Sequence, residues 1–343
     1  MARSQQQPLI YFHSLELENV RCFGERQVLE LTDEQGRLAQ WTLLLGDNGV
    51  GKTTLLQCLA WMRPVPAFSQ KAREPGEGEP DTIEPFLNDA ENEVLNSLLR
   101  VGTEVTLELK ATLSIGQALG IAKKTSPRIE TGIRLVGKNE QLQQRELTTN
   151  SFPPRLNHLA LSELPIFAYG AARRMGVANF DRGELSDPLA SLFFPETELS
   201  DAEEILLRLD YLAARRGGRS ATQRLNKVKE VLTAVLPDVA NAKGIQILGP
   251  KVPGKPEEPS GVRFVTPYGT VPLTGLSLGY QTTLAWTTDL AMRLYERYPD
   301  SPNPLAEPAI VLMDEIDLHL HPCWQLRLIE DLTASFRSLM TVL

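Results

Sequence analysis

The sequence has few cysteines, no long apolar run and no excess of positive charge, and each absence excludes a class of protein. Its three cysteines, Cys22, Cys58 and Cys323, stand far apart without paired spacing, so we predict neither a disulfide framework nor a zinc site. The apolar stretches are too short to span a membrane, and the polar residues 1–7 do not resemble a signal peptide. We therefore expect a cytoplasmic protein that makes no contact with a membrane.

The charge balance excludes a globally basic nucleic-acid binder. The chain of 343 residues carries 35 Lys and Arg against 43 Asp and Glu, a net charge of −8 at pH 7. A local basic groove would not show in this sum. Apolar positions do not follow sustained heptads, which excludes long coiled-coil arms. The length allows one large core or two smaller ones.

Residues 46–54, GDNGVGKTT, have the composition of a phosphate-binding loop. They follow a strand-like run at 41–45 and precede an apolar, helix-like run at 55–61, which is the context that this motif requires. Glycines let backbone N–H groups approach phosphates, and a helix N-terminus favours negative charge. The Lys52 ammonium suits the β- and γ-phosphates, and the Thr53 hydroxyl suits Mg²⁺. The chain is therefore predicted to bind a nucleoside triphosphate. The predicted phosphate-binding residues are Asn48, Gly49, Gly51, Lys52, Thr53 and Thr54.

Alternating and helical patterns organise the rest of the chain. Helical spacing predicts helices at 201–216 and 221–236, which flank a Gly-Gly pair and suggest a helical hairpin lid. Two stretches rich in Pro and Gly, 64–80 and 249–261, indicate flexible segments. Further strands are predicted at 11–20, 26–31, 103–115, 129–136, 164–169 and 262–266.

An apolar run at 309–313 ends in two carboxylates, Asp314 and Glu315. A buried strand would carry them out at its carboxyl end, where an open α/β sheet places its ligand. Downstream of a phosphate-binding loop, this pattern predicts that Asp314 holds the shell of a magnesium ion. Glu315 would polarise the attacking water.

A third segment, residues 276–281 (LSLGYQ), is termed the signature segment and precedes a helix-like run to residue 294. Ser277 suits a helix N-cap, and Gly279 would let the first turn approach an anion. By itself the segment also fits a capped helix without a ligand. Its place between the other two motifs favours a ligand.

The order of these motifs resembles that of the ABC-type ATPases. Residues 314–322, DEIDLHLHP, resemble the branch that contains the RecF, SMC-type and OLD-family ATPases. Transporter ATPases usually have a different sequence after the paired acids. Residues 17–23 (LENVRCF) resemble the first strand and arginine of RecF-like heads, and 169–174 (YGAARR) resemble bacterial RecF/OLD-like proteins. The resemblance covers most of the chain.

This resemblance implies an α/β fold: a P-loop NTPase with an ABC-ATPase-like head, a mixed sheet and an inserted helical lid. It also implies an ATP-dependent homodimer in which two heads hold two ATP molecules, with Mg²⁺, between them. Ser277 and Gly279 would contact the γ-phosphate bound by the partner's Lys52. Asp317 would lie in the loop that crosses the dimer interface, and Arg21 would contact the nucleotide. Lys52 and Glu315 would be the catalytic residues.

The sequence departs from the family pattern in two places. SMC-like relatives commonly have a glutamine at the end of the strand that here ends in Tyr169 and Gly170, so that residue has no equivalent we can assign. The family continues beyond Leu343 with a switch histidine. Either the chain is truncated, or that role is lost or supplied otherwise. OLD-family nucleases carry a further nuclease domain, for which this chain has no room. His319 and His321 have no further His or Cys nearby, so metal ligation is not predicted there.

Four segments follow from these motifs: an N-terminal lobe with the P-loop (1–63), an insertion with a flexible segment and a β-hairpin (64–163), a central strand with the helical lid (164–260), and a lobe with the signature segment and the paired acids (261–343). The predicted function is a nucleotide-driven dimerisation switch in DNA repair or in defence against foreign DNA, with a separate nuclease or effector. The alternatives are an ABC transporter ATPase subunit and an ATP-binding module with little turnover.

DNA is a candidate partner, and contact would require a local basic surface. The alternative is that the arginines are solvated charges or form internal ion pairs. The densest candidates are Arg173, Arg174, Arg215, Arg216 and Arg219.

Overall fold

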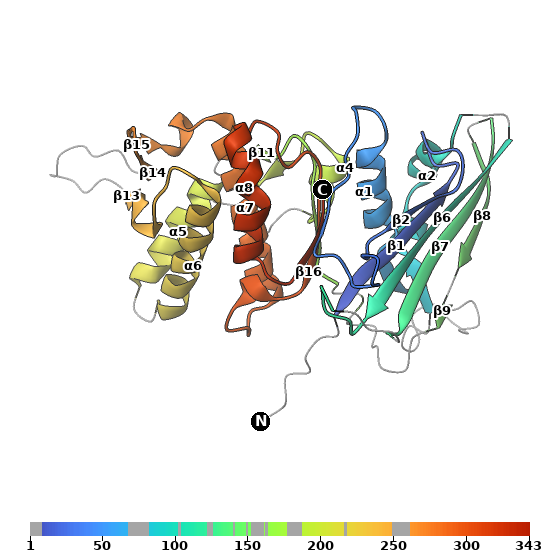
Figure 1. Ribbon diagram of the computed structural model, residues 1–343, viewed down its shortest axis with the longest axis horizontal. Coiled ribbons are helices and arrows are strands. Elements are labelled where there is room, and N and C mark those ends of the chain that lie inside the picture. Colours follow the sequence, from blue (N-terminus) through green and yellow to red (C-terminus); the bar gives the residue numbers. More distant parts are fainter. Residues whose placement is uncertain are drawn as a thin grey trace, which may run out of the picture. The chain divides into compact units, whose positions relative to one another are not determined.

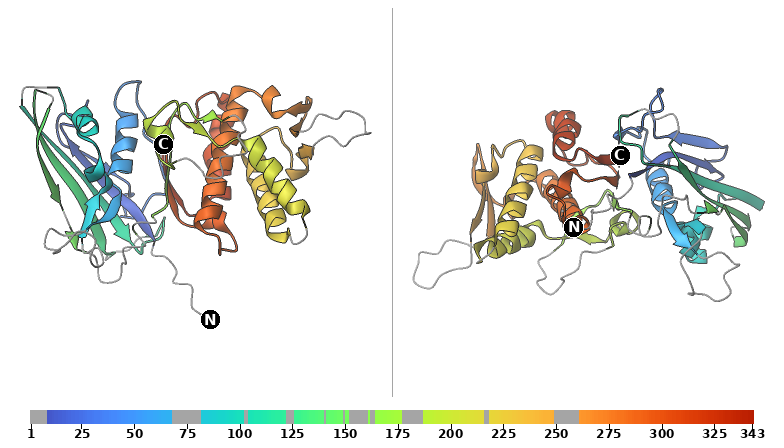
Figure 2. Two further views of the ribbon diagram at one scale, coloured as in Figure 1. Left: turned by 180° about the vertical axis from the view of Figure 1, so that it is seen from behind. Right: turned by 90° about the horizontal axis from the view of Figure 1, so that it is seen from below.

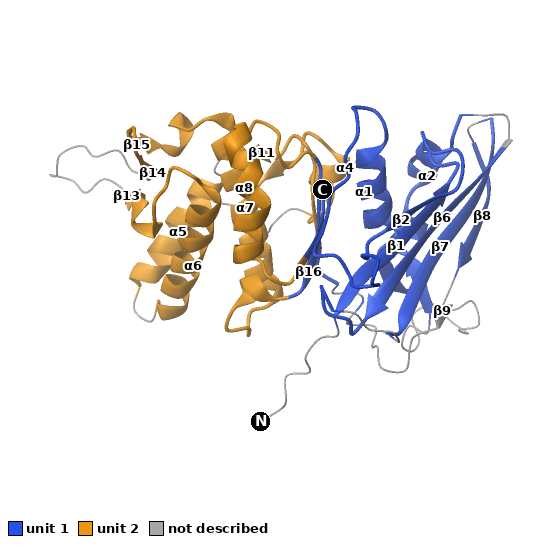
Figure 3. Cartoon of the chain, in the orientation of Figure 1, with its two compact units in different colours: residues 1–166, 308–314, 340–343 blue, residues 167–307, 315–339 orange. Residues whose placement is uncertain are grey.

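The computed structural model consists of two compact units (Figure 3). Unit 1 contains residues 1–166, 308–314 and 340–343, and unit 2 contains residues 167–307 and 315–339. Each unit therefore combines parts of the chain that are distant in sequence. The described residues are 9–67, 82–101, 104–121, 126–139, 141–148, 150–151, 161, 164–176, 187–215, 218–248 and 261–343.

A five-stranded sheet forms the body of unit 1, in the order β2-β1-β6-β7-β8 with every neighbouring pair antiparallel (Figure 1). Four of its strands were predicted, and the sheet joins strands from both sides of residue 63, where the sequence suggested a segment boundary. Its strands are β1 (Ile10–Glu18), β2 (Gln27–Glu30), β6 (Glu104–Ile115), β7 (Arg128–Lys138) and β8 (Gln141–Thr148).

The strand pattern follows from alternation in the sequence. In β1, Leu15 and Leu17 are buried while Glu16 is half-buried, and in β7, Ile133 is buried while Arg134 is exposed. One face of the sheet therefore contributes to the core. β8 was not predicted because its sequence, QLQQRELT, is polar on both faces and mostly exposed.

Helices α1 (Lys52–Trp61) and α2 (Asn92–Leu98) lie on the same side of this sheet (Figure 2). The Thr131 hydroxyl of β7 donates to the Met62 carbonyl at the end of α1, at 2.8 Å. The Asn96 side chain of α2 accepts a hydrogen bond from the backbone of β8. A small antiparallel sheet and a 3₁₀ turn complete this region: β4 (Pro64–Ala67), β5 (Thr82–Pro85), β9 (Asn150–Ser151) and η1 (Phe86–Asp89).

A second sheet of four strands, in the order β10-β16-β17-β3, leads into two of the sequence motifs, the P-loop after β3 and the paired acids after β16. Its parallel β17–β3 pair makes the strand content mixed, so the predicted α/β class is confirmed. Strand β3 is shorter than the predicted run 41–45: pairing reaches Leu44, whose N–H donates to Leu343, but Leu45 is 88% exposed. The strands are β3 (Trp41–Thr42), β10 (Ile166–Tyr169), β16 (Ala309–Met313) and β17 (Leu339–Val342).

Four longer helices dominate unit 2 (Figure 1). α5 (Ala202–Ala214) and α6 (Arg219–Val235) pack as the predicted helical hairpin, and α6 also contacts α7 (Leu278–Arg297) and α8 (Pro322–Ser335). α5 begins where predicted because the Asp201 carboxylate accepts hydrogen bonds from the N–H groups of its first turn.

Shorter elements complete unit 2. The predicted strand 262–266 is β14, the centre of an antiparallel sheet in the order β13-β14-β15 that packs on α5. Most of the two predicted flexible segments, 68–80 and 249–260, lies outside the described residues. Within the described chain, no helix combines the length and hydropathy needed to cross a membrane. The remaining elements are β11 (Arg174–Met175), α4 (Ala190–Phe193), β12 (Glu198–Leu199), η2 (Ala242–Gly244), β13 (Ile245–Leu248), β14 (Gly261–Thr266), β15 (Gly269–Pro272), η3 (Leu273–Gly275) and η4 (Pro304–Ala306).

Candidate nucleotide site

The P-loop connects β3 to α1 in unit 1 and needs glycine where it enters the helix. Gly51 is the N-cap of α1 with φ 103°, a left-handed conformation, and Gly49 has φ 84°. A Cβ at Gly51 would overlap the Cys22 sulfur and the Phe23 ring. The Cys22 thiol in turn lies 3.6 Å from the Val50 carbonyl oxygen. The loop is therefore closely packed against the segment that follows β1.

The first turn of α1 suits an anion. No side-chain hydrogen bond caps this helix, and its first turn holds no acidic residue, so the helix itself supplies no negative charge at the positive end of its dipole. The Lys52 ammonium donates to the carbonyl oxygens of Gly46 and Asp47, at 2.7 and 3.0 Å. Lys52 is thus held over the loop that would enclose a phosphate. Thr54 is buried, so its side chain packs into unit 1.

Thr53 and Asp314 meet in unit 1 although 261 residues separate them. The Thr53 hydroxyl donates to Asp314 Oδ2 at 2.6 Å, which joins the start of α1 to the end of β16. A hydroxyl and a carboxylate are hard oxygen ligands of the kind that Mg²⁺ prefers. Among the described residues, no cluster of three or more His, Cys, Asp or Glu could hold a metal ion alone. The pair therefore fits a Mg²⁺ ion that takes its other ligands from water and phosphate.

Arg21 is engaged along the side of α1. Its guanidinium donates to Gln57 Oε1 at 2.6 Å and to the Ser97 carbonyl at 3.2 Å, and it lies 5.6 Å from the centre of the Trp61 ring. Its φ of 48° is left-handed. These contacts tie the segment after β1 to α1 and α2, and a contact of Arg21 with nucleotide stays a prediction.

The signature segment starts α7 in unit 2. Ser277 occupies the N-cap as predicted, but its hydroxyl makes no capping hydrogen bond and the residue is exposed. Gly279 is buried, and a Cβ there would overlap the carbonyl oxygen of His319. Gly279 therefore lets α7 pack directly on the segment that follows Glu315, a requirement that the sequence alone did not reveal.

The segment 315–321 joins β16 to α8 by a series of turns. Glu315 and His319 both have positive φ, 47° and 68°. The Glu315 carbonyl accepts a hydrogen bond from Leu318 N–H at 3.0 Å. His321 is the N-cap of α8, with Nδ1 accepting from the Cys323 N–H, so this histidine has a structural role. Asp317 is exposed, as an interface residue would be.

The predicted site residues fall in both units. Lys52, Thr53 and Asp314 belong to unit 1, whereas Ser277, Gly279, Glu315 and Asp317 belong to unit 2, and the boundary passes between Asp314 and Glu315. The structure thus assembles the predicted phosphate-binding and magnesium-binding residues Lys52, Thr53 and Asp314 within one unit. It places the signature segment beside the residues after Glu315 within the other.

The proposed DNA-contacting role of Arg173 is wrong. This side chain is only 1% exposed, and its Nη2 donates to the main-chain oxygen of Glu315 at 2.5 Å. Arg174, Arg215 and Arg219 are exposed, with Arg215 stacked 5.2 Å from the Tyr211 ring, while Arg216 lies outside the described residues. No signal in the sequence marked the buried contact, because Arg173 and Arg174 are adjacent and chemically identical.

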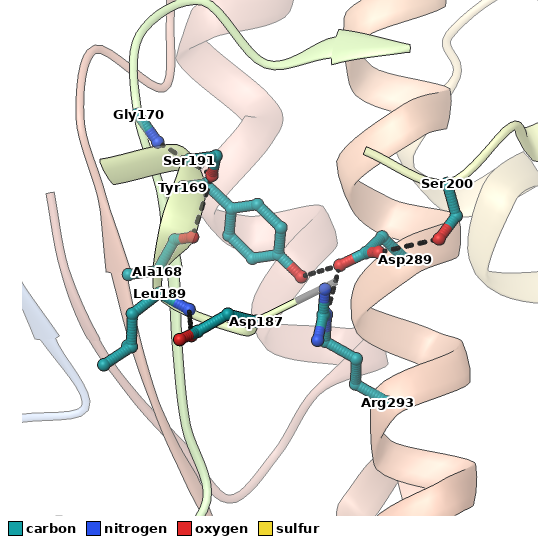
Figure 4. A network of polar contacts seen from close by, with 9 residues as sticks. All are labelled: Ala168, Tyr169, Gly170, Asp187, Leu189, Ser191, Ser200, Asp289 and Arg293. Atoms are coloured by element: carbon teal, nitrogen blue, oxygen red, sulfur yellow. Dashed lines mark hydrogen bonds and ion pairs between the residues drawn. The ribbon is translucent and has the colours of Figure 1, made fainter. Parts of the chain in front are cut away.

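A buried polar network surrounds Asp289 (Figure 4). Asp289 of α7 accepts hydrogen bonds from the Tyr169 hydroxyl at 2.9 Å and from Ser200 at 3.2 Å, and pairs with Arg293 at 2.6 Å. Burial, together with the nearby Asp289 carboxylate, raises the pKa of Tyr169 well above its usual range. Tyr169 therefore stays a neutral donor, and the network fixes the end of β10 to α7.

Comparisons with known proteins place these features in a family. Residues 14–238 match the family model described as AAA domain. The retron Ec83 probable ATPase of Escherichia coli is 48% identical over 67 residues, 20% of this chain and 12% of the relative. The retron Vc95 probable ATPase of Vibrio cholerae is 41% identical over 73 residues, 21% of this chain and 14% of the relative. The Septu protein PtuA of Bacillus mycoides is 24% identical over 95% of this chain and 36% of its own length.

The chain thus spans about a third or less of the length of these curated relatives. Among solved structures, the Smc head domain bound to a ScpA domain, derived from Pyrococcus furiosus, gives a TM-score of 0.47 at 14% identity, over 98% of this chain and 90% of that one. The recombination mediator RecF gives a TM-score of 0.43 at 13% identity, over 98% and 93%. At these values the structural likeness carries no further conclusion.

Proposed function

This chain belongs to the AAA domain family, and on that premise we propose that it is an ATPase of the RecF/SMC/OLD-like branch, which binds and hydrolyses ATP as a dimerisation switch. The observation that carries the proposal is the hydrogen bond between Thr53 and Asp314, at 2.6 Å. It brings the end of β16 to the start of α1, so that the P-loop and Asp314 converge on one place in unit 1.

The residues of unit 1 fit ATP and Mg²⁺. The uncapped first turn of α1 and the Lys52 ammonium would hold the phosphates, with Asn48 and Gly49 in the turn of the loop. Thr53 and Asp314 would hold Mg²⁺, which when bound neutralises charge on the phosphates. Unit 1 would therefore position the phosphates and supply positive charge.

Glu315 would then orient and polarise the attacking water as a general base. Ser277 and Gly279 of a second copy would complete the site from the other side, with Asp317 at the interface. The exposure of Ser277 and Asp317 supports this arrangement, since residues that meet a partner must be accessible in a single chain. ATP would in this way hold two heads together until it is cleaved.

The relatives support a role in defence, with DNA repair as the other candidate for the same switch. Two of them are retron ATPases and one is a Septu protein. We propose that the effector, a nuclease or another protein, is distinct from this ATPase segment. A transporter subunit is the less supported alternative, because residues 314–322 differ from the usual transporter sequence.

Turnover tests the proposal against an ATP-binding module that does not hydrolyse. Glu315→Gln should slow steady-state ATP hydrolysis by at least about a hundredfold while the Kd for ATP stays within a factor of about two, because the amide keeps the shape but loses the base. Glu330→Gln, an exposed glutamate of α8, is the matched control and should hydrolyse at the wild-type rate. A wild-type protein without turnover, or a Glu315→Gln protein with full turnover, would contradict the proposal.

DNA stays a proposed partner, now with Arg174, Arg215 and Arg219 as the exposed candidates. Retention of DNA in the presence of ATP should weaken steeply as salt rises, because Lys and Arg that neutralise phosphates release counterions. The double variant Arg215→Ala, Arg219→Ala should bind more weakly and show a shallower salt slope. Retention that ignores salt, or no retention, would remove DNA as the partner.

A further inference from the structure

Arg173 is a buried arginine whose guanidinium contacts Glu315, at the start of segment 315–321. It is the largest of the fully buried side chains in the described chain, at 1% exposure. Burying a guanidinium is costly unless its charge and donors are used. Here Nη2 donates to the main-chain oxygen of Glu315 at 2.5 Å, a short bond of the charge-assisted kind.

Arg173 contacts Glu315, a residue with an unusual backbone conformation. Glu315 has φ 47°, a conformation that residues with a Cβ adopt rarely and that tends to persist where surrounding structure imposes it. Its carbonyl oxygen accepts two hydrogen bonds, from Arg173 and from Leu318 N–H. Two donors on one carbonyl fix the plane of the peptide that follows Glu315. That plane sets the direction in which the Glu315 side chain leaves the backbone.

The loop that carries Arg173 is itself held firmly. Gly170, at its start, packs so closely that a Cβ would overlap the Ser191 carbonyl oxygen. One residue earlier, the Tyr169 hydroxyl is bonded to Asp289 of α7 in the buried network (Figure 4). Arg173 therefore does not reach Glu315 from a loose loop, but from one anchored on α7 and α4.

Helix α7 also contacts segment 315–321, near the end that is distant from Glu315. Gly279, in the first turn, lies against the His319 carbonyl oxygen, whereas Asp289 is ten residues further on, or about 15 Å along the helix. Helix α7 therefore contacts segment 315–321 directly at His319. At Glu315 the contact is made by Arg173, in a loop that is anchored on the same helix. All of these contacts lie within unit 2.

We propose that Arg173 is a positioning residue for ATP hydrolysis, which holds the main chain of Glu315 so that the carboxylate is aimed at the attacking water. The inference rests on the proposed function, since it assigns Arg173 a role through Glu315. It also links the orientation of the Glu315 carboxylate to α7, the helix whose N-cap is Ser277. A shift of α7 on meeting a partner would reach Glu315 through this loop.

The test separates rate from binding. Arg173→Met keeps the length of the apolar stem but removes the donors, and should lower kcat by about tenfold to a hundredfold, the rate equivalent of one hydrogen bond from a charged donor. The Kd for ATP should stay within about twofold, because the phosphate-binding residues belong to unit 1. Arg173→Lys, which keeps a donor and the charge, should recover part of kcat. The matched control is Arg327→Met, at an arginine of α8 whose side chain is 70% exposed, with wild-type kcat.

A second measurement excludes a merely structural role. In a Glu315→Gln background, adding Arg173→Met should lower kcat by less than about twofold, because a residue that acts through the carboxylate has nothing left to position. Full additivity of the two losses would overturn the inference. So would equal kcat in Arg173→Met and Arg327→Met, or a parallel loss of ATP binding. Wild-type turnover is the separate readout for the proposed function: its absence contradicts that function and the inference together.

Discussion

Replacing Lys52 by alanine is expected to weaken ATP binding by at least about a hundredfold. The ammonium is held over the loop by the carbonyls of Gly46 and Asp47, where a phosphate would meet it. Its loss removes a charge-assisted contact of about 3 kcal/mol, which is about a hundredfold in Kd. The residue after it, Thr53, supplies only a hydroxyl and does not replace the charge. Equilibrium binding of labelled ATP measures the effect.

Lys227→Ala is the control for loss of a positive charge. Lys227 is exposed on α6 and pairs with Glu230 at 2.7 Å, so its removal should leave the Kd for ATP unchanged. If Lys52→Ala and Lys227→Ala bind ATP equally well, the P-loop assignment is wrong.

Removing the buried carboxylate of Asp289 is expected to cost about 3–5 kcal/mol of unfolding free energy. Asp289 is fully buried and pairs with Arg293, whose side chain is 7% exposed, and it accepts the Tyr169 hydroxyl. Asp289→Ala would remove the carboxylate that pairs with the buried Arg293 guanidinium, and would take the acceptor away from the Tyr169 hydroxyl. Urea unfolding followed by circular dichroism gives the difference, provided the slope of free energy against urea is unchanged.

A partly exposed ion pair provides the comparison. Asp331 lies 3.7 Å from Arg327, whose side chain is 70% exposed, so Asp331→Ala should cost less than about 1 kcal/mol. Similar losses for the two variants would mean that the network around Asp289 contributes little to stability. The positioning of the Arg173 loop would then need another explanation.

The parts of the fold that could be predicted are those whose signal is local. Strand β1 follows from the alternation of apolar and polar residues. Helix α5 follows from the helical spacing of apolar residues after Asp201, and the Asp201 carboxylate caps the helix, as expected of an aspartate. The P-loop and the acids after β16 follow from motifs whose chemistry fixes both residue type and spacing. Their convergence at Thr53 and Asp314 agrees with that prediction.

The parts that could not be predicted depend on tertiary contacts. Strand β8 is polar on both faces and is a strand only because β7 pairs with it. The reason for glycine at position 279 appears only when the His319 carbonyl is found against it. Arg173 looked like a surface charge because nothing in its neighbours marks it as buried. A hydrogen bond from a buried arginine to a main-chain oxygen 142 positions away leaves no periodic signal in the sequence.

The central claim, that ATP holds two copies of this chain together, is tested most directly by the size of the Glu315→Gln protein with and without ATP. Slow hydrolysis should preserve the nucleotide, so this variant should run as a dimer with ATP and Mg²⁺ and as a monomer without them. Adding Ser277→Arg should abolish the dimer but not ATP binding. Ser277 is exposed and makes no capping bond, so the change leaves α7 intact while it puts bulk and charge opposite the partner's phosphates. A Glu315→Gln protein that stays monomeric at saturating ATP would contradict the account and leave a solitary ATP-binding module.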